Sequence, residues 1–207
     1  MEKKEMTYYQ PLQTIGFHSC DKEVGLIVLN GEMDLNPSEN SWDWLGRGIY
    51  FWEQNPGRAL LYANESAEGK QKNKTRINTP FVLGGIIELG NCLNLLESDS
   101  LAVVKRAYTW LAEVYANANK DMPVNKGAKR DLDCAVIKWA LAANEKIGIQ
   151  PYDTVRSAFQ EGQALYEGSN FTDRLHVELC VINKELIKGY FLPRPIDRFN
   201  PNLKKAA

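Results

Sequence analysis

An α+β fold in a single domain is predicted by three observations on this sequence. Short segments rich in aromatic and β-branched residues, typical of strands, occur near both ends of the chain. Between them, apolar residues recur every three to four positions, which is the spacing of amphipathic helices. The 207 residues suffice for one elaborated domain but not comfortably for two. We therefore expect one domain, residues 1–207, with a helical insertion at about 97–148.

Strands are predicted at 14–20, 80–90, 154–159 and 175–182, where apolar and β-branched residues predominate. In the last of these, Leu175, Val177, Leu179 and Val181 are expected on one face, which leaves Glu178 on a mixed face with His176, Cys180 and Ile182. An ionised group on such a mixed face needs a partner or a function.

Helices are predicted at 56–68, at 100–117 and at 129–146. The segment 24–31 fits a helix or a strand and ends at an Asn-Gly pair. Residues 92–96 are expected to extend the strand before them or to pair with it. The proline-containing end after residue 193 has the composition of a flexible terminus.

Composition excludes some classes of protein. A net charge of −1 provides no global basic field for nonspecific binding of nucleic acid. The four cysteines show no C-x-x-C spacing, the N-terminus has no apolar core of a signal peptide, and no apolar run is long enough to span a membrane. We therefore expect a cytoplasmic protein with free thiols and no membrane partner.

The stretch 42–63 combines six aromatic residues with Gly46 and Gly48 and includes the start of a predicted helix. The glycines allow a sharp turn or the close approach of a ligand, and the aromatic residues after them predict a short strand. The stretch fits equally well a buried strand corner or a binding site for a flat molecule.

Other chemistry finds little support. The chain contains neither a P-loop nor a G-x-G-x-x-G motif, so use of a dinucleotide would not imply a Rossmann fold. His176 and Cys180 stand four residues apart on a strand, too far for shared metal ligation, and no third histidine completes a zinc set. No metal is expected.

A family resemblance rests on three elements taken in order. Gly16-Phe17-His18-Ser19 lies in the first strand, Leu45-Gly46-Arg47-Gly48-Ile49-Tyr50-Phe51 precedes a helix with Ala59 and Tyr62, and Glu178 lies in a late strand. Together they resemble the His-Tyr-Glu arrangement of the ADP-ribosyltransferase superfamily, in its diphtheria-toxin and poly(ADP-ribose)-polymerase branch. The resemblance covers about residues 14–190 and leaves the segment 97–148 unmatched.

This resemblance implies a split, two-sheet fold with a cleft that binds NAD as cosubstrate. By similarity, His18 would bind the ribose next to nicotinamide, Tyr50 would stack on the nicotinamide ring beside Gly48, and Tyr62 would cover its other face. Glu178 would hold the ribose 2′-hydroxyl while positive charge develops on the sugar.

Some positions depart from the family pattern. Ser19 stands where members often have glycine, although its backbone groups remain available to the nicotinamide amide. The interval between Tyr50 and Tyr62 is one residue longer than in the polymerases, which leaves open that Tyr62 faces the core. Glu161, in the preceding strand-loop region, is the alternative to Glu178 as the catalytic carboxylate.

The expected activity is NAD-dependent transfer of ADP-ribose to a macromolecular acceptor, in a small toxin or defence effector with a neutralising antitoxin partner. Near-neutral charge favours a protein acceptor, while the basic run 70–76 leaves RNA or DNA open. The alternatives are an NAD glycohydrolase and a noncatalytic binding module on the same fold.

Overall fold

The computed structural model describes residues 13–40, 43–70, 76–126, 129–146 and 148–203. Its centre is a seven-stranded mixed sheet with the order β4-β7-β8-β2-β1-β3-β9, which confirms the predicted α+β class. These strands are β1 (Gln13–Asp21), β2 (Ile49–Glu53), β3 (Pro80–Glu88), β4 (Cys92–Asn94), β7 (Thr154–Ala164), β8 (Thr172–Val181) and β9 (Ile187–Phe191). A second, two-stranded sheet pairs β5 (Asn125–Lys126) with β6 (Lys129–Arg130).

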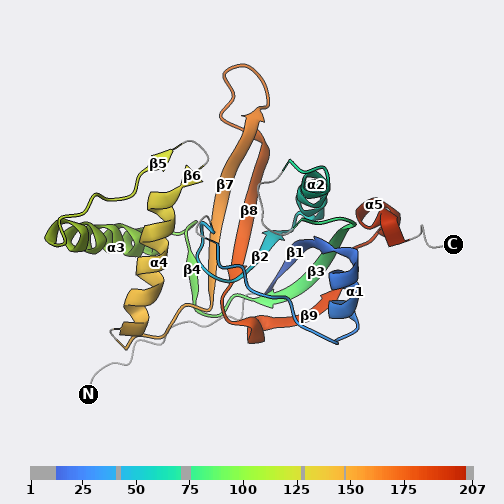
Figure 1. Cartoon of the computed structure of the whole chain (residues 1–207), viewed down its shortest axis with the longest axis horizontal. Helices are drawn as coiled ribbons and strands as arrows, with labels where there is room; N and C mark the ends of the chain where they lie inside the picture. The colour runs from blue at the N-terminus through green and yellow to red at the C-terminus, as the bar shows by residue number, and fades with distance from the viewer. Residues whose placement is uncertain (1–12, 41–42, 71–75, 127–128, 147, 204–207) are drawn as a thin grey trace.

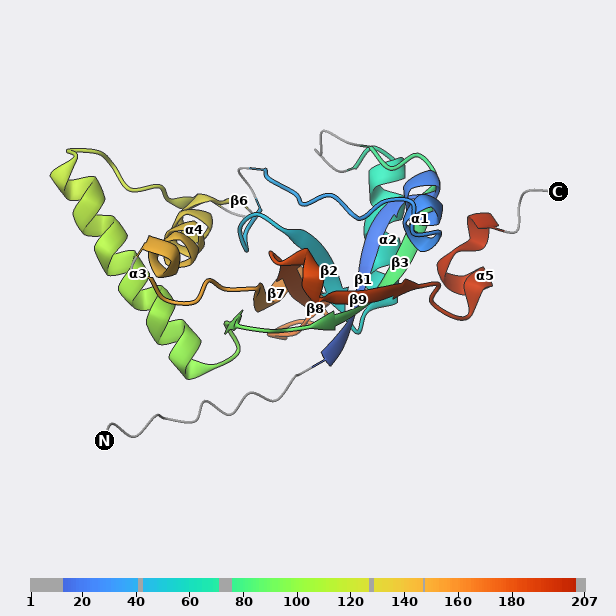
Figure 2. The same ribbon diagram turned by 90° about the horizontal axis from the view of Figure 1, so that it is seen from below.

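The predicted helices are confirmed. They are α2 (Pro56–Ala67), α3 (Ser98–Asn117) and α4 (Asp131–Lys146). The structure also contains α1 (Lys22–Leu29), the short α5 (Ile196–Phe199) and two 3₁₀ turns, Lys184–Leu186 and Pro201–Leu203. The segment 24–31, which fitted a helix or a strand, is helical up to Leu29. Asp21 caps the first turn of α1 by accepting a hydrogen bond from the Glu23 amide. Helices α3 and α4 lie together at the β4 end of the sheet, away from α1 and α5 (Figure 2). No described helix combines the length and the apolar character needed to cross a membrane.

The pairing between neighbouring strands is shortest in the middle of the sheet, between β1 and β2. Strand β1 pairs with β2 only at Gly16–Glu53 and Phe17–Trp52, whereas it pairs with β3 along its whole length. Figure 1 shows β7 and β8 standing nearly upright while β9 runs across the view. The sheet therefore consists of two halves, β4-β7-β8-β2 and β1-β3-β9, joined at this short β1–β2 contact.

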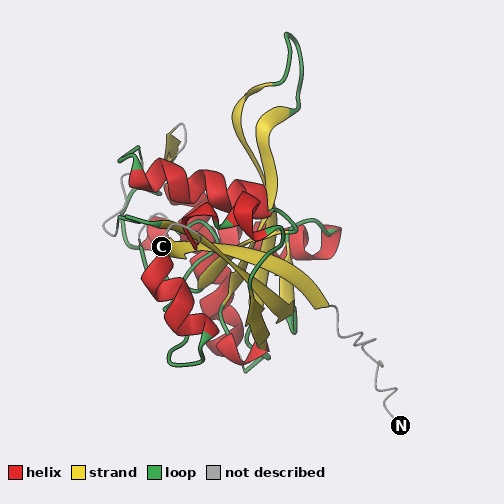
Figure 3. Ribbon diagram, turned by 90° about the vertical axis from the view of Figure 1, so that its right-hand side faces the viewer, coloured by secondary structure: helices red, strands yellow, loops and turns green. Residues whose placement is uncertain are grey.

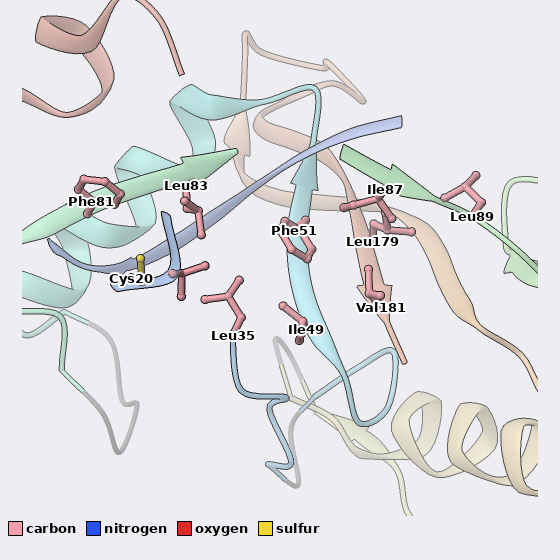
Figure 4. Packing of buried hydrophobic residues seen from close by; sticks show 11 residues of the cluster. Cys20, Leu35, Ile49, Phe51, Phe81, Leu83, Ile87, Leu89, Leu179 and Val181 are labelled. Atoms are coloured by element: carbon pink, nitrogen blue, oxygen red, sulfur yellow. The ribbon is translucent and has the colours of Figure 1, made fainter. Parts of the chain in front are cut away.

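One face of the sheet, here called the core face, is covered by α1 and by Leu35. Its buried residues come from several strands and form one continuous apolar cluster (Figure 4). They include Phe51 and Leu179, which oppose each other in the β2–β8 ladder, and Phe81, which fills the space beside Gly25 of α1. Such a dense apolar cluster stabilises the sheet by removing its side chains from water.

The opposite face, here called the groove face, carries the residues that alternate with these, among them Tyr50, Trp52 and Glu178. Helix α2 covers it over β1 and β3, where Ala59 packs against Phe17 and Trp52. Helices α3 and α4 cover it over β4 and β7. The two covers are separate, so the middle of this face is left for a cavity.

Two expectations for the chain's connections are corrected. Residues 92–94 neither extend β3 nor pair with it, because the turn at Gly90 sends them to the far edge of the sheet, where β4 runs parallel to β7. The segment after Pro193 is not a loose end as far as residue 203. Asn200 is fully buried there, and its side chain accepts from the Val82 amide and donates to the Val82 carbonyl, which replaces a missing strand partner.

Candidate functional site

A polar cavity of about 540 Å³ lies on the groove face, between α2 and the strands β7 and β8. Its volume is within the range of about 300–1,000 Å³ typical of small-molecule sites. Aromatic, cationic and acidic side chains line it together, and they come from α2, β2, β6, β7, β8 and the loop before β2. The main ones are Trp52, Arg58, Tyr62, Glu161, Arg174 and Glu178.

Helix α2 supplies one wall of this polar cavity. It begins with Pro56 in its first turn, and the Asn55 side chain accepts a hydrogen bond from the Arg58 amide. Arg58, Tyr62 and Glu65 then follow at intervals of four and three residues, which places them on one side of the helix. Since Ala59 and Ala63 occupy the side facing the sheet, this polar stripe is turned toward β7 and β8.

Two ion pairs connect the stripe to the β7–β8 hairpin. Arg58 Nη2 lies 2.8 Å from Glu161 Oε2, and Arg174 Nη2 lies 2.6 Å from Glu65 Oε1. Glu161 and Arg174 oppose each other in the β7–β8 ladder, so both pairs act at the same level of the hairpin. Beyond this level the hairpin projects well clear of the rest of the molecule (Figure 3).

Several nitrogen donors at this site have no acceptor among the described residues. Within the described part of the chain, Arg58 Nε, Arg58 Nη1 and Trp52 Nε1 are buried without a hydrogen-bond partner. The Arg58 side chain is only 8% exposed, and its guanidinium carbon lies 5.6 Å from the centre of the Trp52 ring. Buried donors without acceptors are costly and uncommon in native proteins. A ligand rich in acceptor oxygens is the natural partner for them.

The aromatic part of the cavity is a pair of rings. Trp52 and Tyr62 have ring centroids 5.0 Å apart and an interplanar angle of 46°. Tyr62 thus packs on Trp52 and lines the polar cavity. A flat ligand can add to such a pair through stacking or edge contacts.

Glu178 lies on the floor of the polar cavity and has a defined partner. His176, two residues away on the same face of β8, places Nε2 3.1 Å from Glu178 Oε1, while its Nδ1 donates to the Arg174 carbonyl. Burial opposes the charged imidazole, but the bonds to Glu178 and to the Arg174 carbonyl outweigh it and raise the pKa of His176. His176 is therefore the partner that an ionised Glu178 was expected to need.

Tyr50 and Gly48 are not among the residues that line the polar cavity. The Tyr50 hydroxyl donates to the Gly46 carbonyl at 2.7 Å and accepts from the Leu45 amide at 3.1 Å. Burial raises the pKa of this hydroxyl, which keeps it a neutral donor. Gly48 is needed for close packing, since a Cβ atom there would come within 2.6 Å of the Val181 carbonyl oxygen. Both residues thus fix the loop that leads into β2.

His18 and Ser19 also lie apart from the polar cavity. His18 projects from the core face, where its ring centroid lies 5.7 Å from that of Phe51 and its Nδ1 donates to the Tyr50 carbonyl at 2.8 Å. Burial lowers the pKa of His18. Ser19 lies on the groove face and donates its hydroxyl to the Ala59 carbonyl, which ties β1 to α2. Of the residues suggested by the resemblance, the structure brings Tyr62, Glu161 and Glu178 to one cavity.

The sequence analysis assigned no role at the site to Trp52, Arg58 or Arg174. Two patterns pointed to the first two: Trp52 shares a strand face with Tyr50, and Arg58 precedes Tyr62 by one helical turn. The pairing of Arg174 with Glu65 joins residues 109 positions apart, and no local pattern predicts it. Of the basic run 70–76, positions 71–75 lie outside the described residues.

No family model matches the chain, and no curated protein or solved structure matches it either. Among the described residues, histidine, cysteine and carboxylate side chains nowhere gather in a group of three that could hold a metal ion. The polar cavity is therefore the feature that bears most directly on function.

Proposed function

We propose that the protein is an NAD-dependent ADP-ribosyltransferase, which cleaves the bond between nicotinamide and ribose and transfers ADP-ribose to a macromolecular acceptor as a toxin or defence effector. One observation carries the proposal. A single cavity combines the Trp52–Tyr62 aromatic pair with two carboxylates and with buried donors that lack acceptors among the described residues. Nicotinamide, ribose and diphosphate are the flat, hydroxylated and oxygen-rich parts of NAD that such groups complement.

The reaction needs these residue types. When the bond between C1′ of the ribose and the nicotinamide nitrogen breaks, its electron pair leaves with nicotinamide and positive charge develops on the sugar. A fixed carboxylate beside C1′ stabilises that charge. The acceptor atom then bonds to C1′ and gives up its proton, for which a carboxylate is a suitable base.

Two carboxylates are candidates for this role. Glu161 is oriented by Arg58, whose guanidinium lies over Trp52, so Glu161 is linked directly to the aromatic pair. Glu178 opposes Trp52 in the β2–β8 ladder and is held by His176. Each can approach a ribose whose nicotinamide packs on the aromatic pair, and we propose that one is catalytic while the other holds ribose hydroxyls.

We extend the proposal to the split two-sheet fold and to the remaining residues that the resemblance suggested. The short β1–β2 contact, which divides the sheet into two halves, supports a split two-sheet fold of the ADP-ribosyltransferase type. In this proposal His18, Ser19, Gly48 and Tyr50 hold the walls of the cleft: His18 and Tyr50 fix β1 to β2, and Ser19 fixes β1 to α2.

The proposal is tested by incubating the protein with adenylate-labelled NAD and a cell lysate, followed by separation of proteins from nucleic acids. We expect label in one fraction and release of nicotinamide. Glu161→Gln and Glu178→Gln are each expected to reduce the rate, the catalytic one by about 100-fold or more. Glu185→Gln, an exposed carboxylate outside the cavity, is the matched control and should leave the rate unchanged.

Other outcomes separate the alternatives. NAD consumption without labelling identifies a glycohydrolase. If NAD stays intact, and the two cavity variants and the control bind NAD as the native protein does, the protein is a noncatalytic binding module. A toxin is further expected to arrest growth of the cell that expresses it unless an antitoxin is present, and growth despite active protein would contradict that role.

A further inference from the structure

A second cavity, of about 420 Å³, lies on the groove face next to the polar cavity. It is bordered by α3, α4 and β7, and its walls are mostly apolar. Leu101 and Val104 come from α3, Val136 and Ile137 from α4, and Phe159 from β7. Most residues that line this apolar cavity come from the helical segment 97–148, to which the proposed reaction assigns no role.

The two cavities share a wall made by Trp44 and Arg130. The Arg130 guanidinium carbon lies 4.6 Å from the centre of the Trp44 ring, and the ring centroids of Trp44 and Phe159 are 4.9 Å apart. Guanidinium, indole and phenyl groups thus lie in succession. Such flat surfaces bind other flat rings by stacking, with little dependence on the identity of the ring.

Polar groups surround the apolar walls. Lys105 and Asp133 line the same cavity, and Arg130 Nη1 lies 3.5 Å from Asp133 Oδ2. Arg130 Nε is buried and has no partner among the residues that the structure describes. The Arg130 side chain is 37% exposed, so a ring with polar edges can accept from its guanidinium, whereas a purely apolar occupant cannot. Lys105 and Arg130 additionally suit a nearby phosphate.

We propose that the apolar cavity binds an unpaired nucleobase, and that the acceptor of the reaction is therefore a single-stranded nucleic acid. The inference rests on the proposed function only for the transfer step, since base binding is independent of NAD. A nucleobase has apolar faces for the aromatic walls and polar edges for Arg130 and Asp133. Because the two cavities share one wall, a base in the apolar cavity lies beside a ribose in the polar cavity. A base-paired duplex cannot present its bases in this way.

The test uses a matched pair of variants on α3. Tyr108 and Trp110 are 46% and 47% exposed, and only Tyr108 is among the residues that line the apolar cavity. We expect short single-stranded DNA or RNA oligomers to bind the native protein, as measured by fluorescence anisotropy. Tyr108→Ala should weaken that binding about tenfold, within the range for loss of one stacking partner, while Trp110→Ala leaves it within about twofold.

A second variant probes the phosphate contact. Lys105→Gln should weaken binding by a similar factor for every base composition and lower the slope of log affinity against log salt by about 0.7, the value for one phosphate of a single strand. Duplexes of the same sequence should bind at least about tenfold more weakly than the single strands.

Three results would overturn the proposal. One is equal affinity of the Tyr108 and Trp110 variants for single strands, and another is equal affinity of the native protein for duplex. The third is an increase in KM for NAD in Tyr108→Ala with no effect on oligomer binding, which would assign the apolar cavity to the adenine of NAD. If single strands bind as expected but NAD is never consumed, the base site stands and the proposed function fails.

Discussion

The two faces of the sheet differ in how fully their polar side chains are hydrogen-bonded. On the core face, the Glu53 carboxylate accepts from the Thr14 hydroxyl at 2.8 Å and from Arg156 Nε at 2.6 Å. On the groove face, Arg58 has one partner, Glu161, while its Nε and Nη1 have none in the described ranges of the chain. Arg156 thus completes the hydrogen bonds of Glu53, whereas Arg58 keeps two donors without a partner among the described residues.

The covers of the two faces explain this difference. A continuous apolar cluster of α1 and the strands closes the core face, so a polar group there must be satisfied by the protein itself. The groove face has two separate covers, α2 and the α3–α4 pair, with cavities between them. Incomplete polar networks beside a cavity can be completed by ordered water or by a ligand. We therefore expect mutations on the core face to affect stability and those on the groove face to affect function.

The largest expected effect comes from the aromatic residues of the two faces. Phe51→Ala removes a fully buried ring from the core face and should lower the free energy of unfolding by about 3–5 kcal/mol. Tyr62→Ala removes a half-buried ring from the polar cavity and should cost clearly less stability, but it should abolish most NAD binding. Urea denaturation and NAD titration measure the two quantities. Equal losses of stability would contradict the difference between the faces.

A smaller effect is expected from the two arginines. Arg156→Met leaves the 12%-exposed Glu53 side chain without its cation and should cost about 2–3 kcal/mol of stability. Arg58→Met leaves Glu161, whose side chain is 31% exposed and can be hydrated, and it removes two donors that lack partners among the described residues. Its stability should stay within about 1 kcal/mol of the native value, while NAD consumption falls. Denaturation curves that rank the two variants in the reverse order would show this assignment to be wrong.

The smallest expected effect is the pH dependence of stability, with opposite signs for the two histidines. The pKa of His176 is raised in the folded state, so its stabilising contribution is fully present below about pH 6.5 and is lost as the pH rises through the folded pKa. The pKa of His18 is lowered, so its protonation in the unfolded chain reduces stability as the pH falls through about 6.5.

A tenfold difference in proton affinity between the folded and the unfolded chain corresponds to about 1.4 kcal/mol of stability. The measurement is the unfolding free energy of the native chain, His176→Gln and His18→Gln between about pH 5.5 and 8.5, across the ordinary histidine range. On acidification, the advantage of the native chain should grow over His176→Gln and shrink relative to His18→Gln. Parallel pH profiles for the two variants would rule out pKa changes of opposite sign.

Most of the larger helices and strands could be predicted from the sequence. Helical periodicity located α2, α3 and α4, and alternation in β8 placed His176 and Glu178 on one face. These features depend on neighbours within a few residues, and the backbone geometry of helices and strands converts such spacing directly into faces. For the same reason, the stretch 42–63 was correctly divided into loop, strand and helix.

The set of residues that line the polar cavity depends on tertiary packing. Periodicity states which residues share a face of a strand but not which strand lies beside it, and strand order here brings Glu161 to Arg58 across 103 positions. His18 lies on the core face and Tyr62 lines the polar cavity, although both belong to the same resemblance. The tail showed the same limit, because Asn200 is buried against Val82 through a contact 118 positions apart. Local spacing thus determined the elements, and long-range packing determined which of their side chains meet.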